Sequence, residues 1–392
     1  MRLDRVLMAA GVAALGLGTV LANPALAGAT FPGSQNGNVD FIAICDGNIG
    51  QATYSLNPNG TPPPTYTCPG GAAPNYTQTS AGSIDSMPYY SAAGTTLYFS
   101  SNRGGNYSVY SVPYPDTITG TAGSQLDGAT QLTTPASTSN DFAPTVDQNG
   151  NILAFIRCDS AGTTCNLYTQ SPIVGGTPTL VPTSQLLAVP DSVSGAADRP
   201  EIDPVDPTKI IYTGVDGHIH LVSLTGAFAE RDLSVESGIG AGQADEYPDW
   251  KPDGTAIILD SDRNTGHKVF ILNVTTNPAT ITSLWGASDP GTEIEPIYSP
   301  TGAEYVWTKL GSGSNLQLDM GTIVGKASIL VNLTNNKTNN SQPTWQPVSI
   351  GTILPEAPYA VLLPGGALLI LGLAFGVRRR RQPRRPLVTA AG

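Results

Sequence analysis

The stretch that decides the fold is residues 245–259, which read DEYPDWKPDGTAIIL. A first short strand ends near Trp250, and a Pro-Asp-Gly turn follows at residues 252–254. A second and more apolar strand then begins near Ala256. Because Gly and Pro between short apolar runs mark tight turns, this stretch predicts a β-hairpin.

The same phrase recurs along the chain, which is the mark of a repeat architecture. In four copies a glycine stands six residues after a proline and an apolar strand follows; these prolines are Pro88, Pro144, Pro248 and Pro296. A fifth copy begins at Pro200 and reaches its apolar strand one residue later. The copies lie roughly 50 residues apart, which is room for four short strands and their turns.

The two ends of this region each carry half of a repeat. Pro343 and Trp345 repeat the first strand with no second strand after them, while the strand near Phe41 has no such phrase before it. We therefore predict an all-β fold, a six-bladed β-propeller closed by pairing of its N- and C-terminal strands. Such closure removes the exposed edges of an open sheet.

These phrases resemble the TolB-type, WD-like propeller repeat, over roughly residues 37–347. The resemblance implies a propeller fold. It implies little about activity, because this repeat serves translocation scaffolds, the non-catalytic propellers of prolyl oligopeptidases and some polysaccharide lyases.

The ends of the chain predict export and membrane attachment. Residues 1–27 read as a signal peptide, 28–350 as the propeller, 351–358 as a linker, 359–377 as a transmembrane helix and 378–392 as a basic cytoplasmic tail. Residues 354–358 and the segments after them resemble bacterial sortase and exosortase sorting signals, but Ala357 and Pro358 depart from the sortase pattern. We expect an exported protein on the cell surface or periplasmic side, held at the cytoplasmic membrane by the C-terminal helix.

The net charge argues against one class of binding partner, and the cysteine content predicts disulfides. Without the two terminal segments the formal charge is about −17, which argues against nucleic-acid binding. Four cysteines in an exported chain indicate disulfides, most simply Cys45 with Cys68 and Cys158 with Cys165, although four cysteines allow three pairings.

A search for catalytic motifs assigns no catalytic residue. The chain has no Gly-x-Ser-x-Gly elbow and only three histidines. His218 and His220 alternate, so they share one face of a strand and could offer two metal ligands, but a solvated strand face is the simpler interpretation. The acidic pair Asp260 and Asp262 lacks the length and the terminal Glu of an EF-hand loop. We therefore predict no metal site and no cofactor, while a divalent cation remains possible.

Recurring carboxylates are the candidate binding site. Four of them stand three residues before a repeat proline and one stands two before; they are Asp85, Asp141, Asp245, Glu293 and Asp198. If the first strand of each blade is innermost, they encircle one mouth of a central channel. In the alternative, each caps its own loop or pairs with an arginine such as Arg103 or Arg263, which both stand fifteen residues after a repeat proline.

These observations favour a non-enzymatic binding or scaffold protein that takes a protein or a cell-envelope glycan. The alternative is a propeller enzyme acting on carbohydrate, a lyase or hydrolase with carboxylates and a divalent cation at the channel mouth. The oligomeric state is not predicted.

Overall fold

The computed structural model describes residues 37–43, 48–54, 84–113, 129–183, 199–226, 228–264, 266–284, 291–310, 316–322, 328–332, 340–345 and 347. The chain separates into two compact units, Met1–Val348 and Ser349–Gly392, and all described residues belong to the first.

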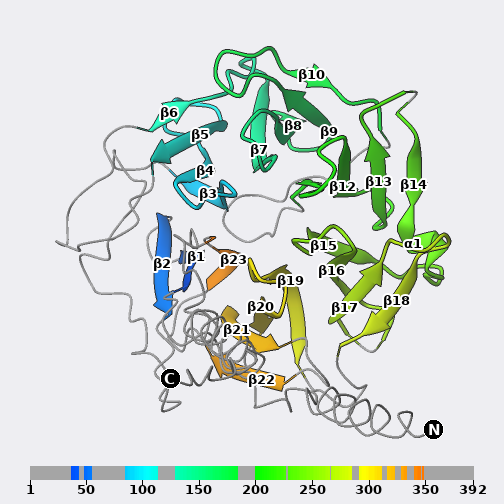
Figure 1. Cartoon of the computed structure of the whole chain (residues 1–392). Helices are drawn as coiled ribbons and strands as arrows, with labels where there is room; N and C mark the ends of the chain where they lie inside the picture. The colour runs from blue at the N-terminus through cyan, green and yellow to red at the C-terminus, as the bar shows by residue number, and fades with distance from the viewer. Residues whose placement is uncertain are drawn as a thin grey trace, which may run out of the picture. The chain divides into compact units, whose positions relative to one another are not determined.

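Five antiparallel sheets have four strands each, in chain order (Figure 1). We name each sheet by its first strand. They comprise β3 (Asp85–Tyr90), β4 (Thr96–Ser101), β5 (Ser108–Pro113) and β6 (Thr130–Gln131); β7 (Ser139–Val146), β8 (Leu153–Asp159), β9 (Cys165–Gln170) and β10 (Thr179–Leu180); β11 (Glu201–Ile202), β12 (Lys209–Thr213), β13 (Ile219–Ser223) and β14 (Glu230–Asp232); β15 (Asp245–Trp250), β16 (Ala256–Ser261), β17 (Lys268–Asn273) and β18 (Thr280–Ser283); and β19 (Thr292–Tyr298), β20 (Glu304–Leu310), β21 (Leu316–Thr322) and β22 (Ser328–Asn332). A short helix, α1 (Leu233–Glu236), follows β14.

A further sheet joins the two ends of the propeller region. It has the order β2-β1-β23, from β1 (Gly37–Ala43), β2 (Asn48–Tyr54) and β23 (Asn340–Trp345), and Val39 pairs with Trp345. The predicted pairing of the terminal strands is therefore confirmed.

The predicted number of blades is wrong. The structure shows five four-stranded blades and not six, because the described part of the closing sheet has only three strands. The sequence count rested on the proline phrase, which reports an inner strand. A complete blade needs four strands, and the two terminal fragments together supply three described ones.

The inner strands form a closed ring of neighbours. Contacts run from β3 to β7, and on through β11, β15, β19 and β23 back to β3. Figure 1 shows the sheets placed around a common centre, with these strands nearest to it. The all-β propeller architecture is confirmed.

The second strand of each blade carries the core. Leu97 and Phe99 of β4 and Leu153 and Phe155 of β8 are fully buried, as is Ile258 of β16. Because neighbouring sheets cover both faces of these strands, their sequences are apolar without interruption, unlike the alternation of a half-exposed strand.

A bulge interrupts most inner strands at the repeat proline. The residue before the proline has a φ between 52° and 55° in five strands; these residues are Met87, Ala143, Tyr247, Glu295 and Gln342. The strand register shifts at each of these points. A non-glycine residue in this region costs on the order of 1–3 kcal/mol, and bulges redirect side chains. An inner edge strand tolerates the proline because no further strand needs its missing N–H.

One predicted disulfide is confirmed, between Cys158 and Cys165 on the hairpin that joins β8 and β9. Cys45 and Cys68, the signal peptide and the predicted span 359–377 lie outside the described residues. Within the described part of the chain, no helix is long and apolar enough to cross a membrane.

Candidate functional site

Three of the five recurring carboxylates lie at matching places and are paired with arginines. Asp85, Asp141 and Asp245 are at most 1% exposed. Their oxygens lie 3.0, 2.6 and 2.5 Å from the guanidinium groups of Arg103, Arg157 and Arg263, respectively. In these three blades, the carboxylate charge is neutralised within the blade.

Aromatic rings of the same blades pack against two of these arginines. The guanidinium of Arg103 lies 5.0 Å from the ring centre of Phe99 and that of Arg157 lies 4.9 Å from the ring centre of Tyr168. Of the other two predicted mouth residues, Glu293 is fully buried and Asp198 lies outside the described residues. Cation binding at this mouth stays a prediction, while the arginine pairing agrees with the architectural alternative.

A hollow of about 210 Å³ lies at the opposite end of the inner strands. All six inner strands contribute to its lining, through residues that follow the repeat proline rather than precede it; examples are Tyr89, Val146, Glu201, Asp249, Ile297 and Trp345. The sequence predicted a site at the start of these strands, and the structure places the cavity at their end.

Residues one or two places after the repeat prolines contact one another from blade to blade. Thr145 of β7 donates its hydroxyl to Oε2 of Glu201 on β11 at 3.3 Å. Asp249 of β15 accepts the backbone N–H of Tyr298 on β19 at 2.8 Å. Two carboxyl groups from adjacent blades thus line one hollow.

Arg199 connects the hollow to a small central cavity of about 40 Å³. Its Nε donates to Oε1 of Glu201 and its Nη1 donates to the carbonyl of Pro88, both at 2.8 Å. The guanidinium also lies 5.3 Å from the ring centre of Tyr89. The Pro88 contact joins the β11 sheet to the β3 sheet, which are not neighbours in the ring, so Arg199 lies across the centre.

The residues that precede the repeat prolines make a separate series of hydrogen bonds around the small cavity. Oε2 of Glu295 accepts the backbone N–H of Gln342 at 2.7 Å, and Oε1 of Gln342 accepts the backbone N–H of Met87 at 3.1 Å. The left-handed bulges turn these side chains toward the centre, so the strained backbone has a direct structural consequence here.

Burial changes the acidity of the central carboxyl groups. It raises the pKa of Glu201 to about 8 and that of Asp249 to about 6, against the opposing effect of the Arg199 charge. Burial also raises the pKa of Glu295. The hollow therefore holds protons near neutral pH that a bound cation could displace.

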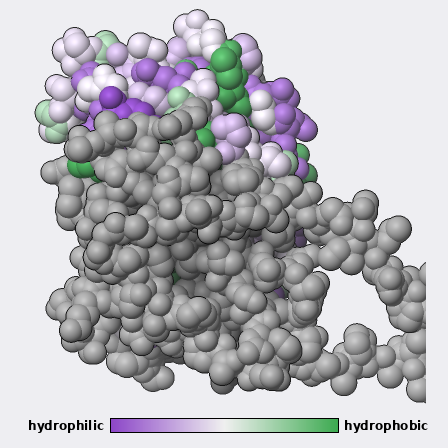
Figure 2. All heavy atoms as spheres, turned by 90° about the vertical axis from the view of Figure 1, so that its left-hand side faces the viewer, coloured by the Kyte–Doolittle hydropathy of each residue, from purple (hydrophilic) through white to green (hydrophobic). Residues whose placement is uncertain are grey.

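Exposed apolar side chains are scattered and offer no competing site. Among side chains that the structure describes, the large exposed hydrophobic residues are Val174, Leu180, Val205, Val215 and Val235. Figure 2 shows hydrophilic residues with separate small hydrophobic spots on the described part of one face. Single exposed apolar residues are normal for soluble surfaces.

Comparison with known proteins gives the fold. No family model matches the sequence, and no curated protein matches it. The structure is similar to TolB from Acinetobacter baumannii, with a TM-score of 0.55, 15% identity, and coverage of 79% of this chain and 66% of that chain. The chain has a TolB-like β-propeller fold. It is also similar to a chain of a nidogen/laminin complex, with a TM-score of 0.52, 10% identity, and coverage of 80% of this chain and 99% of that one. At these identities the likeness shows the fold alone, and this chain spans slightly less than two thirds of that TolB.

Proposed function

We propose that this chain is an exported, non-enzymatic binding protein whose hollow takes a basic segment of a protein partner. The observation that carries the proposal is the pair Glu201 and Asp249, which line one cavity from adjacent blades. Arg199 is their described cationic partner, so ionisation of both carboxyl groups, which a bound cation favours, leaves a net negative site.

The lining suits protein recognition. Tyr89, Tyr90, Trp250, Tyr298 and Trp345 surround the charged residues. Tyr, Trp and Arg dominate the energetics of protein interfaces because they bury a large area and keep a polar handle. About 210 Å³ accommodates a side chain and not a folded domain, so the partner would insert a segment.

The cellular setting belongs to the same proposal. Export through residues 1–27 and attachment through residues 359–377 would place the hollow outside the cytoplasmic membrane. The overall negative charge of the exported part would steer basic segments toward it.

An array of Lys- and Arg-containing peptides, with neutral and acidic counterparts, tests the proposal. The protein should retain basic peptides selectively. Asp249→Asn should weaken their binding about tenfold, because the change removes a negative charge while an oxygen remains to accept the Tyr298 N–H. Asp159→Asn, at the end of β8 and outside the lining of the hollow, is the matched control and should change nothing. Equal retention of acidic and basic peptides contradicts the proposal, as does no retention at all.

A propeller enzyme acting on carbohydrate is the second candidate. It is favoured by one observation: two carboxyl groups in one cavity whose pKa values differ, at about 8 and about 6. Such a difference can provide an acid and a base at neutral pH. Turnover of a panel of acidic and neutral oligosaccharides, abolished by Glu201→Gln, would establish this function in place of the first.

A further inference from the structure

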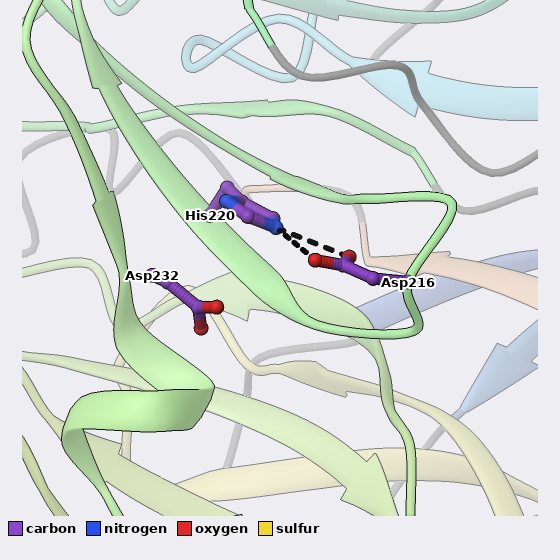
Figure 3. A group of neighbouring side chains, drawn as sticks. All are labelled: Asp216, His220 and Asp232. Atoms are coloured by element: carbon purple, nitrogen blue, oxygen red, sulfur yellow. Dashed lines mark hydrogen bonds and ion pairs between the residues drawn. The ribbon is translucent and has the colours of Figure 1, made fainter. Parts of the chain in front are cut away.

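A histidine and carboxylate cluster lies on the β11 sheet, away from the hollow. Tyr212, His220 and Asp232 are directly opposite one another on β12, β13 and β14. Asp216 reaches the same place from the hairpin between β12 and β13 (Figure 3). His220 is only 5% exposed, so the prediction of a solvated strand face is wrong for this histidine. The tight hairpin and the packing of Tyr212 on the imidazole, with ring centres 5.3 Å apart, cover it.

Both ring nitrogens of His220 face carboxylate oxygens. Nε2 lies 3.2 Å from both oxygens of Asp216. Nδ1 lies 2.8 Å from Oε1 of Glu230, although the contact is not aligned as a hydrogen bond. A neutral imidazole has one N–H, so one nitrogen directs a lone pair at a carboxylate. A metal ion in front of Nε2 would remove this mismatch, because Nδ1 could then carry the N–H toward Glu230.

The second histidine joins the same group. Nδ1 of His218 lies 2.8 Å from Oδ2 of Asp232 and 3.7 Å from Oδ2 of Asp216. Within the described residues, the ion pairs of Asp216 and Asp232 are made only with these two histidines, and no lysine or arginine takes part. The cluster thus has an excess of negative charge that the arginine-paired acids lack.

Glycine at position 214 makes room for the cluster. A Cβ there would lie 2.4 Å from Oδ1 of Asp216 and 2.8 Å from Nε2 of His220. Gly214 does not have a left-handed φ, so the close approach of the two side chains, and not the backbone conformation, is what excludes a larger residue.

We propose that Asp216, His220 and Asp232 bind a divalent transition-metal ion, with zinc as the best fit. One donor atom from each residue lies within 4.8 Å of the others. A tetrahedral zinc site with bonds of about 2.0–2.1 Å has donors roughly 3.3 Å apart, near the 3.2 Å between His220 and Asp216. Mixed imidazole and carboxylate donors favour zinc over calcium or magnesium, which prefer oxygen alone.

Two further side chains would hold these ligands in place. His218 fixes Oδ2 of Asp232, whose Oδ1 also accepts the Val235 N–H at the start of α1. Glu230 lies against the far nitrogen of His220, as outer carboxylates do behind zinc-bound imidazoles. Three protein ligands leave a coordination position for water or a bound group.

Titration of zinc into the chelator-treated full chain tests the proposal, with calorimetry for the affinity and elemental analysis for the stoichiometry. We expect saturable binding and a rise in melting temperature. Asp216→Ala should weaken zinc binding by about tenfold or more. Because the Asp216 side chain is exposed, misfolding would be a poor explanation for this loss of affinity. His220→Gln should have the same effect, and Gly214→Ala a smaller one through crowding.

His267→Gln is the matched control because Glu246, Asp260 and His267 form the other described group with suitable donors. It should leave zinc affinity within twofold. Absence of zinc binding to the wild type overturns the proposal, and so does binding that survives Asp216→Ala. Loss of zinc binding in His267→Gln, with zinc binding retained in His220→Gln, also overturns the proposal, because the ion would then be bound by the other group.

Discussion

Two groups of carboxylates in this propeller differ in the cation that accompanies them. Asp85, Asp141 and Asp245 each have an arginine of the same blade, with a charge that is always present. Asp216 and Asp232 instead have His218 and His220, whose charge depends on protons or on a bound ion. The first group recurs in three of the described blades, while histidines accompany carboxylates in two described clusters, one in the β11 sheet and one, with Asp260 and His267, in the β15 sheet.

The difference separates architecture from function. A permanent partner makes a carboxylate part of the scaffold and leaves it little capacity to bind anything else. The central acids Glu201 and Asp249 resemble the second group, because together they have a single arginine between them and protons that can be displaced.

Removing an arginine-paired acid should have the largest effect on stability. Asp245→Ala leaves the buried guanidinium of Arg263 without its carboxylate, and we expect a loss of about 3–5 kcal/mol in the free energy of unfolding. Urea denaturation measures it, with Asp253→Ala on an exposed turn as control. A loss below about 1 kcal/mol would show that the pair is not structural.

The disulfide provides a covalent comparison in the β7 sheet. Cys158 and Cys165 are seven residues apart, so the closed loop is short. Replacing both with Ala should cost about 2–3 kcal/mol through greater entropy of the unfolded chain. Unfolding of the reduced wild type should match that of the double variant, and a difference between them would point to a packing effect.

Stability should fall as pH rises from about 5 to 8. Folded Glu201 and Asp249, with pKa values raised to about 8 and about 6, bind protons in this range that the unfolded chain has already released. The native state therefore loses stability as these groups release their protons across this range. Burial raises the pKa of Asp260 to about 7, so its deprotonation adds to the loss of stability in the same pH range. Melting temperature against pH measures this, and Glu201→Gln should flatten the slope; an unchanged slope refutes the assignment.

An exposed ion pair should matter least. Lys209 and Asp206 lie 2.9 Å apart but are 43% and 39% exposed, so water and salt screen their attraction. Lys209→Ala should change the free energy of unfolding by less than about 1 kcal/mol. A larger change would mean that exposure is a poor guide to which carboxylates are structural.

The sequence predicted the architecture better than the site because repetition is visible in a single chain. The proline phrase located the inner strands, the turn glycines such as Gly94 and Gly254, and the pairing of the N- and C-terminal strands. The same logic directed attention to the five recurring acids, of which Asp85, Asp141 and Asp245 are paired with arginines. It also overcounted complete blades, because the phrase marks only an inner strand.

The sequence did not predict the hollow, because the residue types that line it differ from blade to blade. Directly after the repeat prolines stand Tyr89, Thr145, Glu201, Asp249, Ile297 and Thr344, which share a place in the ring and no chemistry. Aligning the repeats and noting where they differ would have brought Glu201 and Asp249 together. The contact of Arg199 with Pro88 could not have been found in this way, because it depends on the path of one long side chain across the centre.

The most direct test of the account is the affinity of one basic peptide, chosen from the array, for three forms of the protein. The forms are the wild type, Asp249→Asn in the hollow and Asp85→Asn at the arginine-paired end, each shown to be folded by circular dichroism. We predict binding about tenfold weaker for Asp249→Asn and unchanged within twofold for Asp85→Asn. The reverse pattern, with Asp85→Asn losing the peptide and Asp249→Asn keeping it, would contradict the account.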